Sequence, residues 1–165
     1  MKTLILVRHA KSSWDKPGMS DLERPLNERG KKDAPEMAKR LKERNVLPDL
    51  LLSSTAKRAK KTARLFADEL GLDKEIIKEN ESLYMATPEA FNETLGALDD
   101  RHRVVALFSH NPGITEYAST LTNVRVDDMP TCAIFAVQAA TEKWSDFESA
   151  EKKFLFFDYP KNPLP

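Results

Sequence analysis

The chain has 165 residues, which is enough for one compact domain with its own core, and we expect a single domain over residues 1–165. Its 26 lysine and arginine residues balance its 26 aspartate and glutamate residues. Because nucleic-acid-binding proteins usually carry a basic excess, we expect no nucleic-acid partner. Apolar residues make up 41% of the chain and charged residues 32%, which argues against a disordered or fibrous protein.

Features of export are missing from the sequence. The N-terminal apolar run at residues 4–7 is too short for a signal peptide or a membrane span. The single cysteine, Cys132, has no partner for an intramolecular disulfide and is expected to be buried and inert. We therefore expect a cytoplasmic protein with no membrane partner.

Short apolar runs bounded by polar residues recur along the chain and predict buried β-strands. Stretches with helical spacing of apolar residues lie between them and predict helices. Strands that alternate with helices favour βαβ units, so we expect an α/β fold with a mostly parallel sheet and helices on both faces. The predicted strands span residues 2–8, 49–53, 75–78, 103–109, 133–138 and 153–158, and the predicted helices span residues 27–45, 55–70, 87–98 and 112–121.

Capping residues mark the ends of the predicted helices. Asn27 and Thr87 are favoured N-cap residues, and Pro88 follows Thr87 at the first helical position. Gly71 suits a C-terminal cap. The stretch at residues 10–26 has no apolar period and predicts a long loop, which in a small domain is often functional.

Candidate functional residues come shortly after four of the predicted strands. Ligands of α/β sheets bind just beyond the carboxyl ends of the strands. We therefore expect these side chains to meet at one edge of the sheet. They are Arg8 and His9 after the first strand, Arg58 after the second, Glu81 after the third and His110 after the fourth.

Two arginines and two imidazoles at one sheet edge suit phosphoryl transfer. A phosphoryl group carries about two negative charges near neutral pH, and the forked guanidinium groups of Arg8 and Arg58 match its oxygens. A neutral imidazole can attack phosphorus and form a covalent phosphohistidine, while a second imidazole such as that of His110 donates to the phosphoryl group. Because the arginines supply the positive charge, we expect neither a metal ion nor a cofactor.

Four motifs stand in order along the chain: Leu-Val-Arg-His-Ala-Lys-Ser at residues 6–12, Arg-Pro-Leu-Asn-Glu-Arg-Gly at 24–30, Ser-Ser-Thr-Ala-Lys-Arg-Ala at 53–59 and His-Asn-Pro-Gly at 110–113. Together they resemble the histidine phosphatase superfamily and, within it, the SixA-type phosphohistidine phosphatases. The resemblance implies a three-layer α/β/α fold, which is phosphoglycerate mutase-like. It implies His9 as the nucleophile. It also implies a phosphate pocket that is formed by Arg8, Arg58 and His110.

Four further residues in or beside these motifs are candidates for substrate binding. For Asp21 and Arg24, the alternative is an ion pair that braces the loop. Ser53 and Ser54 are interpreted as helix caps rather than ligands. The four candidates are Ser12, Asp21, Arg24 and Asn111.

The source of a catalytic proton is less well marked. Asn111 stands where the acid-phosphatase branch of the family has aspartate, which removes one standard proton donor. Glu81 is the remaining candidate acid, and a surface carboxylate is the alternative. A site with a weak proton donor suits a phosphoramidate substrate, because the nitrogen of phosphohistidine leaves with less proton donation from the enzyme than an alkoxide needs. Trp14 either lines the substrate entrance or covers the edge of the core.

The function that these features favour is a metal-independent phosphatase for phosphohistidine on a protein, such as a histidine phosphotransfer-type domain. One alternative is a phosphatase or phosphomutase for small phosphate esters on the same fold. A mutase must exclude water, and the sequence offers no segment for a lid. The other alternative is a non-catalytic module that binds phosphorylated ligands. That module predicts the loss of the nucleophile or an arginine, and all are present here.

Overall fold

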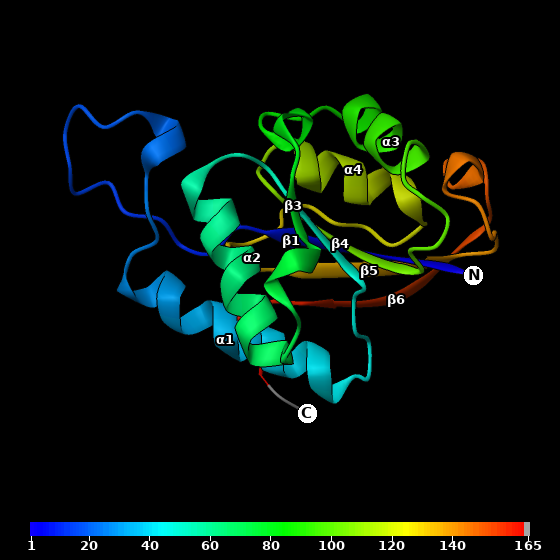
Figure 1. Ribbon diagram of the computed structural model, residues 1–165, viewed down its shortest axis with the longest axis horizontal. Coiled ribbons are helices and arrows are strands. Elements are labelled where there is room, and N and C mark those ends of the chain that lie inside the picture. Colours follow the sequence, from blue (N-terminus) through cyan, green and yellow to red (C-terminus); the bar gives the residue numbers. More distant parts are fainter. Residues whose placement is uncertain (164–165) are drawn as a thin grey trace.

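The structure is a computed structural model that describes residues 1–163. The protein contains a six-stranded β-sheet with helices on both faces (Figure 1). The helices are α1 (Glu28–Glu43), α2 (Lys57–Leu70), α3 (Pro88–Gly96) and α4 (Gly113–Leu121). The strands are β1 (Lys2–Arg8), β2 (Leu50–Ser53), β3 (Ile77–Glu79), β4 (Val104–Ser109), β5 (Ile134–Ala139) and β6 (Lys152–Asp158).

The strand order is β3-β2-β4-β1-β5-β6. The first four strands in this order are parallel to one another, whereas β5 runs antiparallel to β1 and β6 antiparallel to β5. A parallel pair needs a long crossover, and only residues 140–151 with a one-turn helix connect β5 to β6, so these two strands form an antiparallel pair. The expected α/β class with a mostly parallel sheet is confirmed.

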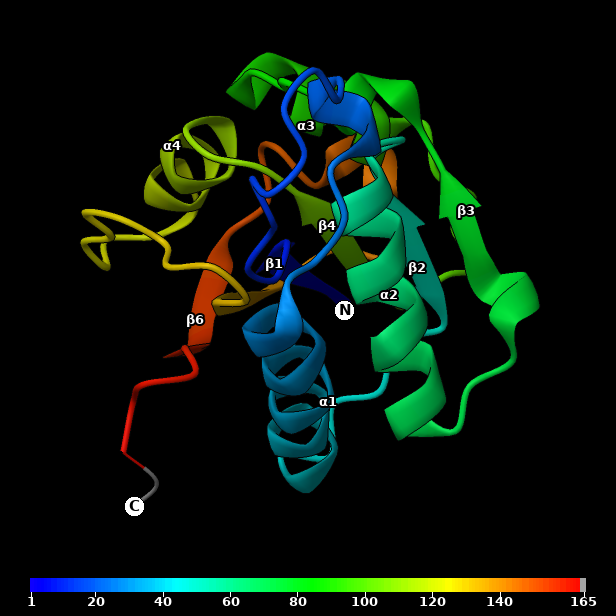
Figure 2. The ribbon, with the colours of Figure 1, turned by 90° about the vertical axis from the view of Figure 1, so that its left-hand side faces the viewer.

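The three layers follow from the alternation of side chains along β1. Leu4 and Leu6 belong to the core that packs against α3 and α4. Ile5 and Val7 belong to a second core that packs against α1 and α2, which lie side by side in Figure 2. Because successive strand residues point to opposite faces, the run of four apolar residues at 4–7 contributes two side chains to each core. The central position of β1 places the residues that follow it at the middle of the sheet edge.

The capping predictions are confirmed. The Asn27 side chain accepts from the Gly30 amide at 2.8 Å and that of Thr87 from the Ala90 amide at 3.2 Å. Gly71 has φ of 69°, the left-handed conformation that a helix C-cap favours. Within residues 1–163, no helix combines the length and the apolar character that a bilayer span requires.

Two motif glycines are explained by close approach of the backbone. A Cβ atom at Gly30 would overlap the carbonyl oxygen of Lys11, and one at Gly113 would overlap that of Ala86. Glycine therefore lets the first turn of α1 lie against the segment after His9. In the same way it lets the first turn of α4 lie against the segment that ends at Ala86. Both contacts shape the edge of the sheet where the candidate residues lie.

Candidate active site

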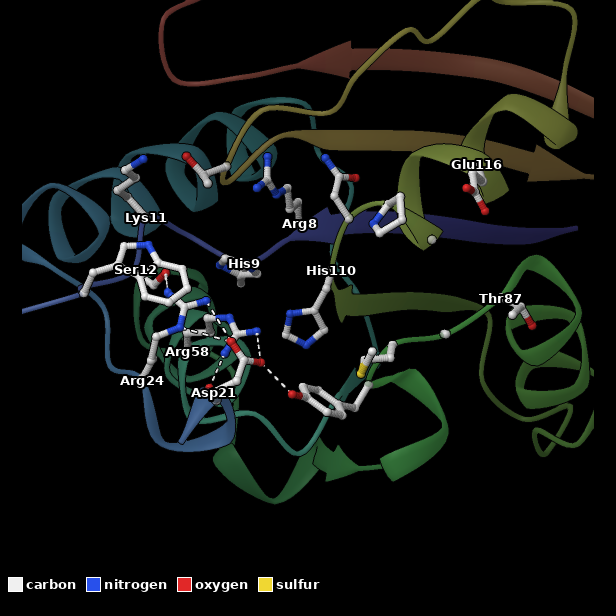
Figure 3. A pocket seen from close by; sticks show the side chains of 18 residues that line it. Arg8, His9, Lys11, Ser12, Asp21, Arg24, Arg58, Thr87, His110 and Glu116 are labelled. Carbon is white, nitrogen blue, oxygen red and sulfur yellow. Dashed lines mark hydrogen bonds and ion pairs between the residues drawn. The ribbon is translucent and has the colours of Figure 1, made fainter. Parts of the chain in front are cut away.

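A hollow of about 730 Å³ lies at the carboxyl ends of β1, β2 and β4 (Figure 3). As expected, the four residues predicted to form the nucleophile and the phosphate pocket line it together. The rest of its wall comes from the loop at residues 10–26, the segment at 84–87 and the first turn of α4. These four residues are Arg8, His9, Arg58 and His110.

The ring of His9 has one hydrogen-bonded nitrogen and one free nitrogen. Its Nδ1 lies 2.7 Å from the carbonyl oxygen of Ala10, and because a carbonyl only accepts, Nδ1 carries the proton. The lone pair is therefore on Nε2, which has no hydrogen-bond partner among residues 1–163. Burial, together with the neighbouring His110 and Arg58, lowers the pKa of His9 to about 3. The imidazole is thus neutral at neutral pH, with its lone pair free to react.

Three buried side-chain nitrogens around this hollow have no hydrogen-bond partner within the described chain. They are Nε of Arg8, Nε of Arg58 and Nδ1 of His110. Buried polar atoms nearly always have partners, so a cluster of unpaired ones beside a hollow is typical of a site that binds a polar ligand. A fourth such atom, Nε of Arg40, lies elsewhere, on α1 beside Asp158. Three unpartnered nitrogens on three residues that line one pocket suit the three oxygens of a phosphoryl group.

The outer nitrogens of both arginines hold these side chains in place. Arg8 donates from Nη1 to the carbonyl of Met129 at 2.9 Å. Arg58, buried in the first turn of α2, donates from Nη1 to the carbonyl of Asp21 at 2.6 Å and from Nη2 to its carboxylate at 2.9 Å. The protein therefore holds Arg8 through one outer nitrogen and Arg58 through both, and it leaves each Nε unpaired.

His110 sits beside His9, with ring centroids 5.1 Å apart. Its Nε2 lies 2.6 Å from Oγ of Ser54, and the edge of its ring meets Tyr84 at 5.5 Å between centroids. Burial and the charge of Arg58 lower the pKa of His110 to about 4, so this imidazole is also neutral at neutral pH.

The interpretation of Ser53 and Ser54 as helix caps is wrong. The N-cap of α2 is Ala56, which has no side-chain cap bond. Ser54 Oγ instead contacts His110 and accepts from the Ala56 amide at 3.2 Å. Ser53 Oγ donates to the carbonyl of Ser54 at 2.9 Å. The helix begins later than predicted, which leaves the Ser54 hydroxyl to contact His110.

The loop at residues 10–26 forms the other wall through a network of side chains. Asp21 and Arg24 make the ion pair that was the alternative interpretation, at 3.1 Å, and both line the hollow. Nη1 of Arg24 donates to Ser12 Oγ at 2.5 Å, and its guanidinium carbon lies 3.5 Å from the ring centre of Trp14. Trp14 is 75% exposed and lines the hollow, so it belongs to the entrance and not to the core edge.

Asp21 is also the point at which this loop meets Tyr84, whose hydroxyl donates to the carboxylate at 2.5 Å. Partial burial alone would raise the pKa of Asp21. The hydrogen bonds from Tyr84 and Arg58, with the charge of Arg58, outweigh it and hold that pKa well below its ordinary range. Asp21 is therefore an ionised acceptor and not a proton donor.

Glu81, the candidate acid, is not brought to the pocket. It begins a one-turn helix, Glu81–Leu83, that Asn80 caps by accepting from the Ser82 amide. In this turn Leu83 is buried and Glu81 is exposed, outside the lining of the hollow. The carboxylate that the structure adds is Glu116 of α4, which Figure 3 shows at the end of the hollow away from His9.

Asn111 lines the hollow, but its amide group makes hydrogen bonds within the protein. Its Nδ2 donates to the carboxylate of Asp128 at 2.9 Å and to the carbonyl of Met129 at 3.1 Å, and its Oδ1 accepts from Thr115 at 2.5 Å. Met129 also accepts from Arg8. The side chain of Asn111 therefore supports the segment that holds Arg8 instead of facing a substrate.

Sequence reasoning missed several residues that line the hollow. Lys11 lies inside the first motif, so its place in the motif was a usable signal. Tyr84 and Met85 follow no pattern, because their position depends on the turn after β3. These missed residues are Lys11, Tyr84, Met85, Thr87, Glu116 and Thr131. Across the part of the chain that the structure describes, no three His, Cys, Asp or Glu side chains are grouped as metal ligands.

Comparisons with known proteins agree with this geometry. Residues 4–83 match the histidine phosphatase superfamily (branch 1). An uncharacterized chloroplastic protein of Arabidopsis thaliana is 30% identical over 153 residues, which are 88% of this chain and 70% of that protein. The 2,3-bisphosphoglycerate-dependent phosphoglycerate mutase of Bifidobacterium longum is 41% identical over 69 residues. Those residues are 39% of this chain and 27% of the mutase.

A solved structure supports the same assignment. The crystal structure of a candidate phosphohistidine phosphatase SixA from Agrobacterium tumefaciens is 26% identical to this chain, with a TM-score of 0.81. The similarity covers 96% of this chain and 98% of that one. Both chains therefore have one α/β architecture over nearly their whole length. This chain belongs to the histidine phosphatase superfamily, as a histidine-nucleophile phosphatase with a SixA-type fold.

Proposed function

We propose that this enzyme removes the phosphoryl group from a phosphohistidine side chain on a protein, through a phosphorylated His9. The observation that carries this proposal is the arrangement at the sheet edge. The free lone pair of His9 Nε2 shares a hollow with three unpaired donors, which belong to Arg8, Arg58 and His110. That set provides a nucleophile together with a fixed cradle for the oxygens around phosphorus.

In the first step, Nε2 of His9 attacks phosphorus and the bond from phosphorus to the substrate imidazole breaks. A phosphohistidine that carries a proton on its other ring nitrogen leaves as a neutral imidazole, so the scissile nitrogen needs no proton. The three donors hold the oxygens as charge redistributes in the transition state. The Ala10 carbonyl accepts from Nδ1 and stabilises the positive charge that His9 acquires.

In the second step, a water molecule attacks the phosphorus of phospho-His9. The bond from phosphorus to Nε2 breaks, His9 is restored as a neutral imidazole, and the water proton leaves with inorganic phosphate. The same three donors serve both steps because the phosphoryl oxygens occupy the same positions.

The state of Asp21 supports a phosphorus–nitrogen bond as the target. This carboxylate is the one that contacts Arg58, and its hydrogen bonds keep it ionised. An alkoxide leaving group requires a proton at the scissile oxygen, which an ionised carboxylate does not supply. An imidazole leaving group carries its proton elsewhere on the ring, so the site suits it better.

Two exposed apolar side chains support a protein as the carrier of the phosphoryl group. Trp14 is 75% exposed and Met85 is 80% exposed, and both line the hollow. Large apolar residues exposed at the mouth of a site favour contact with another protein, because that contact removes them from water. A histidine phosphotransfer-type domain is the kind of partner that fits. The volume of the hollow also suits a small phosphate ester, which is the alternative substrate.

The test compares hydrolysis of a phosphohistidine-bearing protein with that of a panel of small phosphate monoesters, in the presence of a chelator. We expect turnover of the protein to be much faster than that of any ester, and absent in His9→Ala. Faster turnover of one ester would overturn the proposal in favour of a small-ester phosphatase. Oxyanion binding without turnover of any substrate would favour a binding module.

The same assay tests the protein contact. The double variant Trp14→Ala/Met85→Ala is expected to lower kcat/KM for the phosphoprotein by roughly 10-fold, the effect of losing contact residues that each contribute up to about 1 kcal/mol. Hydrolysis of free phosphohistidine should stay within about twofold. Leu47→Ala is the matched control, because Leu47 is an exposed apolar residue outside the hollow. Equal losses for both substrates would contradict a role in protein recognition.

A further inference from the structure

The contact between Ser54 and His110 decides where the proton of a neutral His110 lies. Both residues are buried, and Ser54 Oγ is 2.6 Å from His110 Nε2. Ser54 Oγ also accepts from the Ala56 amide at 3.2 Å. Its own hydrogen is therefore free to be donated, and His110 Nε2 is its partner.

The opposite assignment leaves two buried groups unsatisfied. If Nε2 carried the proton, Ser54 Oγ would accept from two N–H groups and its hydroxyl hydrogen would have no acceptor among the described residues. His110 Nδ1 would then be a buried lone pair with nothing to accept from. Buried polar groups left unpaired cost free energy, so the arrangement with the proton on Nδ1 is favoured.

With the proton on Nδ1, His110 offers a donor to the pocket. Figure 3 shows a nitrogen of the His110 ring on the side that faces His9. A phosphoryl oxygen held there accepts from that N–H. In the other tautomer a lone pair would face the oxygen and repel it.

We propose that Ser54 is a positioning residue, which holds neutral His110 in the tautomer with the proton on Nδ1 so that an N–H group faces the phosphoryl oxygens. The inference rests on the proposed function in that His110 binds the transferred group. Ser54 itself does not touch the substrate. It acts through the imidazole, as a second residue orients the base in other nucleophilic sites.

The direct test measures the ¹⁵N chemical shifts of the His110 ring at pH 7. The chain has three histidines, so His9→Gln and His102→Gln variants assign the signals. We expect a protonated Nδ1 and an unprotonated Nε2 in the parent protein, and a mixture of tautomers in Ser54→Ala. A parent protein with the proton on Nε2 would overturn the inference, whatever the activity of any variant.

The functional test uses tungstate as a probe of the oxyanion cradle together with steady-state kinetics. Ser54→Ala should weaken tungstate binding and lower kcat by roughly 10- to 100-fold, up to the effect of losing one oxyanion donor. Ser54→Thr, which keeps the hydroxyl, should recover most of the loss. Ser53→Ala is the matched control, because Ser53 is an adjacent buried serine whose hydroxyl bonds a backbone carbonyl. Equal losses in both alanine variants would overturn the inference.

This design separates the two proposals. If a phosphohistidine protein is not a substrate but tungstate binding and the ¹⁵N shifts depend on Ser54, the proposed function fails and the positioning role stands. If phosphohistidine is hydrolysed while Ser54→Ala changes neither the tautomer nor the tungstate affinity, the positioning role fails and the proposed function stands.

Discussion

The pocket has two halves that are built in different ways. The buried half consists of Arg8, His9, Arg58 and His110, and the loop half consists of Ser12, Trp14, Asp21, Arg24 and Tyr84. The residues of the buried half lie at strand ends and at a helix start: the His9 amide donates to the Ser109 carbonyl at 3.1 Å, which joins the end of β1 to that of β4. In the loop half, bonds between side chains determine position.

This difference suggests a division of labour. Reactive groups need fixed geometry, which strand ends and a helix start supply. Groups on an exposed loop can adapt to whatever carries the phosphoryl group. The ion pair between Arg58 and Asp21, at 2.9 Å, joins the two halves. Substitutions in the buried half should therefore abolish chemistry, and those in the loop half should change binding.

The largest effect is expected from His9→Gln, because it removes the proposed nucleophile while keeping a polar side chain. Turnover of every phosphoryl substrate should fall by at least about 1,000-fold, as expected when a nucleophile is lost. Tungstate should still bind within about 10-fold of the parent protein, because the three donors remain. Rapid-quench trapping should show phosphoenzyme only in the parent protein. Residual turnover within 10-fold of the parent would contradict the assignment.

Arg58→Lys is expected to lower kcat/KM by roughly 100- to 1,000-fold, the effect of losing one preorganised oxyanion donor. A lysine ammonium cannot bond both the carbonyl and the carboxylate of Asp21 and also present an Nε donor. Arg64→Lys is the control, since Arg64 is exposed on the same helix. A loss of less than about fivefold at position 58 would show that the fork geometry is unimportant.

The buried half also makes stability depend on pH. His9 and His110 have pKa values lowered to about 3 and about 4, so between pH 7 and pH 5 the unfolded chain binds protons at these positions and the folded chain does not. Stability therefore falls as the pH falls below about 6.5, by roughly 2 kcal/mol per histidine at pH 5. Chemical denaturation at the two pH values measures this change.

The double variant His9→Gln/His110→Gln is the control for that measurement. It should lose most of the pH dependence, because the two titrating groups are gone. An unchanged dependence in the double variant would assign the effect to other groups.

The smallest effect is expected in the loop half. Asp21→Asn should tighten tungstate binding by a few-fold, because it removes a negative charge near the bound anion while its side-chain oxygen still accepts hydrogen bonds. The effect is modest because the side chain is 45% exposed and screened by solvent. Asp15→Asn, in the same loop but outside the hollow, is the control. Weaker binding in Asp21→Asn would show that Asp21 mainly orients Arg58.

Much of the fold was predictable because its signals are local. The apolar run in β1 predicts a buried strand. Asn27 and Thr87 begin helices, and Gly71 ends one, by bonds or backbone conformations within a few residues. The motifs placed His9 and His110 behind parallel strands, and parallel strands end at one edge. These features need only periodicity and capping, which the order of residues contains.

Contacts between distant side chains were decided by the tertiary structure alone. Ser54 and His110 are 56 residues apart, and Asp21 and Tyr84 are 63 apart. Glu81 is turned to solvent because the buried side chain of its one-turn helix is Leu83. The sequence by itself thus determined the elements and the edge at which the nucleophile lies. Only packing decided which side chains meet there, because such contacts depend on the positions of whole elements and not on neighbours in the chain.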